Sequence, residues 1–249
     1  MKKIISFSLW GSNPKYTYGA IENARLAKTI YPGWIARFYC GTDVHPSIIS
    51  ALKDEEAEVI IVNEANDNRG MFWRFYAASD KDCSFVIFRD TDSRLTIREA
   101  EAVEQWVQSS RAGHIMRDHP YHDMPIMGGM WGCRGDIFPD MYDLIREFSA
   151  IDKKNQDQLF LQKKIYSILI EKGVYVHDDF FCYEKNARPF PSPRKNYHFV
   201  GEIINESNER EHHWIEIKKY KYSLLYRLRF LMYKTKLKLK LKIFGYTYV

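Results

Sequence analysis

The most informative stretch of this sequence lies at residues 85–92 and reads Phe85-Val86-Ile87-Phe88-Arg89-Asp90-Thr91-Asp92. Four consecutive apolar residues are typical of a strand buried on both faces of a sheet, and the run stops abruptly at Arg89. Asp90 and Asp92 follow where the chain turns, so the two acids can point at one place. Carboxylate oxygens suit Mn²⁺ and Mg²⁺, which keep coordination positions open for substrate phosphates. We therefore expect a divalent-cation site at the end of this strand.

Upstream of this stretch, apolar strands alternate with helices. Strands are predicted at residues 3–9, 35–39 and 59–62, and helices at residues 21–27, 46–52 and 69–79. Such alternation predicts an α/β fold with a mostly parallel central sheet and helices on both faces. Ligands of these sheets bind at the carboxyl ends of the strands. The chemistry is therefore expected just after Leu9, Tyr39, Val62 and Phe88.

Asp90-Thr91-Asp92 resembles the D-x-D motif of A-type, metal-dependent glycosyltransferases, in the position after an apolar strand that this family uses. Two further elements resemble those of bacterial lipooligosaccharide galactosyltransferases and glycogenin-like enzymes. Asp157 and Gln158 open a predicted helix in a sequence similar to D-Q-x-x-L, whose Asp and Gln face the transferred sugar. His198-Phe199-Val200-Gly201 is similar to H-[FY]-x-G, whose histidine completes the metal site and whose glycine lets the backbone approach the diphosphate. The resemblance extends over residues 1–201.

The resemblance implies the nucleotide-diphosphosugar transferase fold, a Mn²⁺ or Mg²⁺ cofactor and a nucleotide-diphosphate sugar donor, expected to be a UDP-hexose. It leaves the third metal ligand open between two histidines. His177 follows an apolar strand at the expected catalytic edge, whereas His198 lies between Tyr197 and Phe199 and could be a packed residue. We therefore favour His177 as the ligand.

The chain departs from the family at Glu202, because the Lys-Pro-Trp sequence that follows in the family is missing. This departure puts the basic contact to the donor diphosphate in doubt. Arg194 and Lys195 are the candidates to replace it. Arg74, on the predicted helix at residues 69–79, is a further candidate, because an arginine fork matches the geometry of a phosphate group.

Other positions match the donor and acceptor sides of such a site. Ser8 and Trp10 end the first strand, where A-type enzymes hold the nucleotide base and ribose. Residues 125–132 form a glycine-rich aromatic loop that lacks the pattern of a phosphate-binding loop. We expect this loop to line the acceptor cleft, with backbone approach and stacking supplied by Gly128, Gly129 and Trp131.

Residues 117–123 are dense in titratable groups. An inverting enzyme needs a carboxylate base for the acceptor hydroxyl, and Asp118 and Asp123 are the candidates in this segment. The likeness to the galactosyltransferases favours retention of configuration instead.

The positive charge of the chain is concentrated at residues 214–249, here called the tail. The tail carries ten Lys or Arg against one acid, a net charge of +9, whereas the whole chain has +5. The first 213 residues therefore carry −4, which disfavours a nucleic-acid-binding protein. Apolar residues at helical spacing in the tail are typical of a helix in a membrane interface: Leu224, Leu225, Leu228, Leu231 and Met232. The alternating sequence at residues 236–242 predicts a polybasic segment that forms no amphipathic helix.

We therefore expect a catalytic domain at residues 1–213 and a tail at residues 214–249 that binds an anionic membrane surface. Four widely spaced cysteines fit a reducing compartment. The sequence contains no run of 18 apolar residues, so no membrane-spanning helix is predicted. The expected location is the cytoplasm, at the inner face of the plasma membrane. The expected acceptor is a lipid-linked or surface glycan, such as lipopolysaccharide core or capsule.

Two alternatives stay open. A nucleotidyltransferase acting on sugar phosphates would carry a basic glycine-rich loop after the first strand, and residues 12–15 fit that poorly. A catalytically inactive, membrane-bound adaptor on the same fold would show no dependence on a metal.

Overall fold

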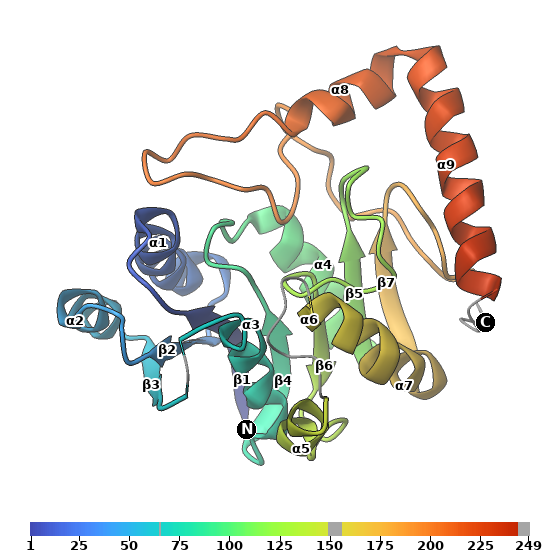
Figure 1. Cartoon of the computed structure of the whole chain (residues 1–249). Helices are drawn as coiled ribbons and strands as arrows, with labels where there is room; N and C mark the ends of the chain where they lie inside the picture. Colours follow the sequence, from blue (N-terminus) through green and yellow to red (C-terminus); the bar gives the residue numbers. More distant parts are fainter. Residues whose placement is uncertain (65, 149–155, 244–249) are drawn as a thin grey trace.

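The computed structural model describes residues 1–64, 66–148 and 156–243, and its central element is a seven-stranded sheet (Figure 1). The strands lie in the order β3-β2-β1-β4-β6-β5-β7. Their bounds are β1 Lys2–Leu9, β2 Ile35–Gly41, β3 Glu58–Val62, β4 Cys83–Phe88, β5 Gly113–Arg117, β6 Trp131–Arg134 and β7 Val174–Asp178. β6 runs antiparallel to β4 and β5, and the other neighbouring pairs are parallel. The expected mostly parallel α/β sheet is confirmed, with one reversed strand that the sequence did not predict.

Helices pack on both faces of the sheet through two separate hydrophobic clusters. The helices are α1 Pro14–Ile30, α2 Pro46–Asp54, α3 Gly70–Trp73, α4 Ile97–Val107, α5 Met141–Arg146, α6 Gln156–Phe160, α7 Tyr166–Lys172, α8 Trp214–Tyr222 and α9 Leu224–Ile243. One cluster joins α1, α2 and α4 to the sheet, with Trp106 fully buried in it. The other joins α3, α5 and the helices from α6 to α7, around Trp73 and Phe160.

The helix predicted at residues 69–79 is divided into α3 and a 3₁₀ helix, Arg74–Ser79. Two serines of β1 bind the backbone of Arg74 at the junction. The Arg74 N–H donates to Ser8 Oγ at 2.8 Å, and Ser6 Oγ donates to the Arg74 carbonyl at 2.6 Å. These contacts hold Arg74 at the carboxyl end of β1.

The tail forms α8 and α9, which lie at one end of the molecule (Figure 1), while residues 244–249 lie outside the described part. Ile217, Phe230 and Leu241 join Phe180 and Phe181 in one buried cluster. The tail therefore packs against the loop that follows β7.

α9 continues through residues 236–242, where the sequence predicted no amphipathic helix. Leu237 and Leu241 lie one turn apart and pack against the cluster around Phe180, whereas Leu239 is exposed. The alternating pattern hides this helix, because packing against the domain selects every second leucine. Within the described residues, no helix combines the length and the apolar composition needed to cross a membrane.

Candidate functional site

A cavity of about 830 Å³, here called the cleft, opens at the carboxyl ends of β1 and β4, where ligands of such sheets bind. Its walls come from segments far apart in the sequence, including the start of α1, the 3₁₀ helix, the start of α6 and the segment after β7. The residues expected at the site that line this cleft are Ser8, Trp10, Arg74, Asp90, Asp92, Asp157, Gln158 and Gly201. Folding therefore brings most of the expected donor-side residues together.

Arg74 joins two carboxylates of the cleft. Its buried guanidinium pairs through Nη1 with Asp90 Oδ1, and its Nη2 lies 3.0 Å from Asp157 Oδ2. Burial raises the pKa of Asp157, although the charge of Arg74 opposes that effect. The arginine fork that we expected to bind a donor phosphate is thus occupied by protein carboxylates. It links the D-x-D motif to the D-Q element.

Asp92 lies beside a lysine of α1. Lys15 Nζ is 3.5 Å from Asp92 Oδ2 and 3.0 Å from Glu211 Oε1. Burial, followed by the charge of Asp90, raises the pKa of Asp92 to about 6. A bound cation offsets both the burial and the mutual repulsion of the two acids. Asp90 and Asp92 therefore fit a divalent metal ion in charge and in ligand chemistry.

The described residues supply no third protein ligand for such an ion. Within the described residues, no group of three or more His, Cys, Asp or Glu side chains is arranged to hold a metal. Mg²⁺ is commonly bound by one or two carboxylates, with water and substrate phosphates in the other positions. Asp90 and Asp92 would hold a metal in that manner.

His177 is not brought to the cleft, so the structure corrects our preference for it as a metal ligand. It is fully buried, with Nδ1 2.9 Å from His114 Nε2 and Nε2 3.1 Å from Gln105 Oε1. Burial lowers the pKa of His177 to about 4. The physical reason is the strand order: β6 and β5 separate β7 from β4, which amounts to roughly 14 Å at the usual strand spacing.

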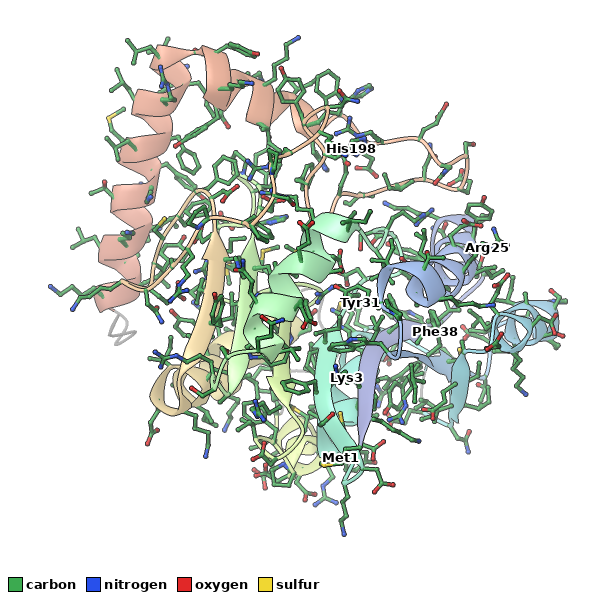
Figure 2. The ribbon with its side chains drawn as sticks, turned by 180° about the vertical axis from the view of Figure 1, so that it is seen from behind. Met1, Lys3, Arg25, Tyr31, Phe38 and His198 are labelled. Atoms are coloured by element: carbon green, nitrogen blue, oxygen red, sulfur yellow. The ribbon has the colours of Figure 1, made fainter. Side chains whose placement is uncertain are left out.

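The second candidate ligand, His198, also lies away from the cleft lining. Its side chain is about half exposed, and Nδ1 lies 2.7 Å from Glu202 Oε2. Figure 2 labels it on the segment that leads to the tail. Gly201 does line the cleft, with a positive φ of 79° and Met130 packed against it. The H-[FY]-x-G element therefore contributes its glycine to the cleft and not its histidine.

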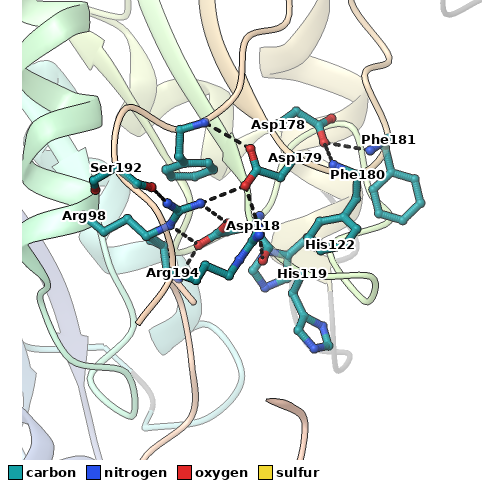
Figure 3. A network of polar contacts seen from close by, with 12 residues as sticks. Arg98, Asp118, His119, His122, Asp178, Asp179, Phe180, Phe181, Ser192 and Arg194 are labelled. Atoms are coloured by element: carbon teal, nitrogen blue, oxygen red, sulfur yellow. Dashed lines mark hydrogen bonds and ion pairs between the residues drawn. The ribbon is translucent and has the colours of Figure 1, made fainter. Parts of the chain in front are cut away.

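Asp118 is fully buried and does not line the cleft, which corrects its expected role as a catalytic base. Its carboxylate accepts hydrogen bonds from Arg98 Nε and Nη2, each at 2.9 Å, from Arg194, and from the Val200 N–H at 2.9 Å (Figure 3). Arg194 also pairs with Asp179 at 2.8 Å. With its oxygens so occupied, Asp118 anchors the segment after β7. Arg194 is likewise committed to this network and not to the cleft.

Asp123 and Lys195 do not line the cleft either. The Asp123 carboxylate accepts a hydrogen bond from Tyr233 of α9, and its carbonyl accepts one from Tyr183 at 2.6 Å. Asp123 thus helps to fasten α9 to the domain.

Within residues 125–132 only Met127 lines the cleft, while Gly128 and Gly129 leave room for the side chains of the carboxylate cluster. A Cβ at Gly128 would collide with the Arg74 guanidinium, and one at Gly129 would collide with the Asp90 carboxylate. Trp131 is fully buried in β6, with its ring tilted against that of Phe88, so our expectation of a stacking wall is corrected. The sequence missed this because an exposed loop and a short buried strand can share one composition.

Two histidines of residues 117–123 line the cleft without having been singled out. His119 accepts a hydrogen bond from the Tyr121 N–H at Nδ1 (3.0 Å), and its Nε2 lies 2.9 Å from the His213 carbonyl. His122 accepts one from the Asp118 N–H at Nδ1 (3.0 Å). Burial lowers the pKa of His119 to about 4 and that of His122 well below its usual range. His122 is therefore neutral, with its proton on Nε2, where it can donate to a ligand.

Two buried polar atoms of the cleft have no hydrogen-bond partner within the described residues: Arg74 Nε and Gln158 Oε1. Leaving such an atom unpaired costs about 1–3 kcal/mol. One is a donor and the other an acceptor, and in this conformation both lie beneath the surface of the cleft without solvent contact.

The fold is similar to that of known structures, although sequence comparison finds no relative. No protein-family model matches the chain, and no curated protein matches its sequence. A crystal structure of S. aureus TarS superposes with a TM-score of 0.50 at 13% identity, covering 72% of this chain and 58% of that chain. This chain thus spans less than two thirds of the TarS chain that it matches.

Two weaker superpositions have TM-scores of 0.46. One is a mannosyltransferase from Pyrobaculum calidifontis in complex with GDP-Man and Mn²⁺, at 11% identity over 79% of this chain and 59% of that chain. The other is 4-diphosphocytidyl-2C-methyl-D-erythritol synthase from Anaerococcus prevotii, at 10% identity over 77% of this chain and 91% of that chain.

The class of fold follows from the likeness to TarS together with the sheet order. The chain has the fold of A-type nucleotide-diphosphosugar transferases, a mixed and mostly parallel seven-stranded sheet between helices. At such low identity the likeness defines the fold, and the chemistry has to be argued from the cleft.

Proposed function

We propose that this protein is a metal-dependent glycosyltransferase that moves a sugar from a nucleotide-diphosphate sugar, with UDP-hexose as the expected donor. One observation carries the proposal. The D-x-D acids Asp90 and Asp92 meet Asp157 and Gln158 in a single cleft at the carboxyl ends of β1 and β4. These residues are far apart in the sequence, and their convergence at the edge where this class of sheet binds ligands is expected if they form one functional site.

The nucleotide would lie at the end of β1. Trp10 lines the cleft there, half-buried, with its ring edge-on to Trp73 at 6.1 Å. A ring supported on one side can stack on a base with the other. The Ser8 hydroxyl accepts a hydrogen bond from the Arg74 backbone, which keeps this wall of the cleft in place.

Mn²⁺ or Mg²⁺ would be held by Asp90 and Asp92, and it would offset the negative charge that develops on the departing diphosphate. The sugar would lie toward α6, where Asp157 and Gln158 line the cleft. His122 also lines the cleft, and its Nε2–H would be available to the ligand. With Asp118 buried away from the cleft, a base for inversion is missing from the expected positions, which favours retention.

The acceptor would be a lipid-linked or surface glycan, such as lipopolysaccharide core or capsule, reached at the inner face of a membrane. Support comes from the tail, which we treat as a unit distinct from the catalytic residues 1–213. Other residues of α9 pack on the domain, but its apolar stripe stays exposed to solvent. The stripe consists of Leu224, Leu225, Leu228, Leu231 and Met232. Basic side chains at residues 227–242 would add roughly 1 kcal/mol each at an anionic lipid surface.

A nucleotidyltransferase acting on sugar phosphates is the second candidate, and a catalytically inactive adaptor the third. The segment after β1 enters α1 directly, capped by Asn13 and followed by Pro14, so it is no glycine-rich basic loop. The convergence of the D-x-D acids with Asp157 and Gln158 in one cleft disfavours an inactive adaptor.

The proposal is tested by nucleotide release and nucleotide binding. UDP-, GDP-, CMP- and dTDP-sugars are incubated with wild type and Asp92→Asn, with Mn²⁺ and with EDTA. Metal-dependent release from one donor, lost in Asp92→Asn, establishes the class and names the nucleotide. Because some transferases need the acceptor, calorimetric binding of each nucleotide with Mn²⁺ is measured in the same samples. If no nucleotide is released and none binds, the result favours the catalytically inactive adaptor.

A further inference from the structure

Lys15 stands next to the D-x-D motif and has no role in the function proposed above. It lies in the first turn of α1, whose neighbouring residues Ser12, Asn13 and Tyr16 line the cleft. Its side chain is 22% exposed, and its Nζ lies between Asp92 Oδ2 at 3.5 Å and Glu211 Oε1 at 3.0 Å. The lysine thus bridges the metal-binding motif and the segment before the tail.

Each acid of the D-x-D motif has a counter-ion from the chain itself. Asp90 is paired with Arg74 and Asp92 with Lys15. The two cations differ in freedom to move. Arg74 is buried and also bound to Asp157, whereas a lysine carries a compact charge on a flexible stem.

Glu211 is held beside Lys15 by the backbone around it. The Ile204 N–H donates to the Asp92 carbonyl at 2.8 Å, and the Glu211 N–H donates to the Ile203 carbonyl at 3.2 Å. Ile203 also forms a bridge to Ser93. This segment therefore follows the D-x-D turn, and Glu211 remains a partner for Lys15 when Asp92 is engaged elsewhere.

The cleft also needs a cation for the donor diphosphate. Arg194, the candidate from the sequence, is bound to Asp118 and Asp179, and the fork of Arg74 is occupied by carboxylates. A divalent ion on Asp92 would repel an ammonium group 3.5 Å away. Lys15 itself is not a lining residue, but its neighbours Ser12, Asn13 and Tyr16 line the cleft, so a displaced ammonium group has the cleft beside it.

We infer that Lys15 is an exchangeable counter-ion: it neutralises Asp92 in the metal-free protein and, held by Glu211, binds the donor diphosphate once the metal occupies Asp92. The diphosphate half of this inference rests on the proposed function. The metal half concerns the motif alone. Lys15 thus contacts the donor directly, and its loss has opposite effects on the affinities for the metal and for the donor.

The test uses Lys15→Gln, Lys15→Arg and, as a matched control on the same helix, Lys28→Gln, which pairs with Glu55 away from the cleft. Two affinities are measured by calorimetry on the full chain: Mn²⁺ alone, and UDP in saturating Mn²⁺. Lys15→Gln is expected to raise the affinity for Mn²⁺ without nucleotide about threefold or more, because the cation that competes for Asp92 is removed. It is expected to weaken UDP about tenfold, the usual effect of losing one charge-assisted hydrogen bond. Lys15→Arg and Lys28→Gln should stay within about twofold of wild type.

The opposite changes in the affinities for Mn²⁺ and UDP distinguish this role from a structural one, because a structural role would lower both affinities together. Equal directions for the two affinities, or no change in either, overturn the inference while leaving the proposed function intact if wild type binds UDP with Mn²⁺. If wild type binds no nucleotide at all, the proposed function and the diphosphate half fail together. The Mn²⁺ titration then still decides whether Lys15 competes for Asp92.

Discussion

Asp92→Asn is expected to abolish metal binding and, at the same time, to stabilise the metal-free protein. The Asp92 side chain is only 16% exposed, and burial together with the charge of Asp90 raises its pKa from 3.8 to about 6. One pKa unit corresponds to about 1.4 kcal/mol, so keeping Asp92 ionised in the folded protein costs about 3 kcal/mol. That value already includes the favourable effect of Lys15. Asn has similar size and no charge to maintain.

The pH dependence has a defined sign. Asp92 binds a proton more tightly in the folded protein than in the unfolded chain, so its contribution to stability is highest below pH 3.8 and is lost as the pH rises through about 6. Asp92→Asn lacks this loss. The free energies of unfolding of wild type and Asp92→Asn should therefore differ by less than about 1 kcal/mol at pH 4 and by about 3 kcal/mol at pH 7 and above. For a chain of this length, the larger difference corresponds to roughly 6–12 °C in Tm.

The assay is urea unfolding in EDTA at pH 4, 5, 7 and 8, repeated at pH 8 with Mn²⁺. Wild type should gain stability from Mn²⁺, and Asp92→Asn should not. Asp54→Asn, at an exposed position ending α2, is the matched acid-to-amide control and should follow wild type throughout. If Asp92→Asn is no more stable than wild type at pH 8 in EDTA, the electrostatic account of the motif is refuted.

Three further outcomes follow from the site. Asp118→Asn should lower the free energy of unfolding by about 2–3 kcal/mol, because it leaves Asp179 as the one acid partner shared by the largely buried Arg98 and Arg194; a catalytic base would instead leave urea unfolding unchanged. Gly129→Ala should weaken Mn²⁺ binding by about tenfold or more while the circular dichroism spectrum stays native, since the added Cβ displaces the Asp90 carboxylate; unchanged Mn²⁺ affinity would contradict this. Replacing Leu225 and Leu228, both at least half exposed, by serine should abolish sedimentation with anionic vesicles and change Tm by less than about 2 °C. Sedimentation equal to wild type would refute the membrane role of the tail.

The exposed leucines are a better test of the tail than its deletion. Ile217, Phe230 and Leu241 lie in one buried cluster with Phe180 and Phe181, so removing the tail would expose the loop after β7. Loss of vesicle binding after deletion would then have two explanations. Point substitutions on the exposed face change the surface and leave the buried cluster alone.

Local patterns predicted the elements that depend on local properties. β1 to β4 match the predicted strands because each is a short apolar run between turns, and the D-x-D acids follow β4 directly. Their place in the cleft followed from a general property of parallel sheets. By contrast, the sequence predicts a loop where β6 lies, because glycines precede and interrupt this strand of only four residues, Trp131–Arg134.

The amino-acid sequence by itself determined the α/β class, the position of Asp90 and Asp92 at the end of β4, and the basic character of the tail. Tertiary structure alone decided which histidines lie in the cleft, because strand order separates His177 from β4 while the turn after β5 brings His119 and His122 to it. The tertiary structure also shows that Asp118, a candidate base in the sequence, is buried and binds Arg98 and the Val200 N–H. The physical reason is that a side chain's chemistry depends on the charges and solvent around it, and these come from residues distant in the chain.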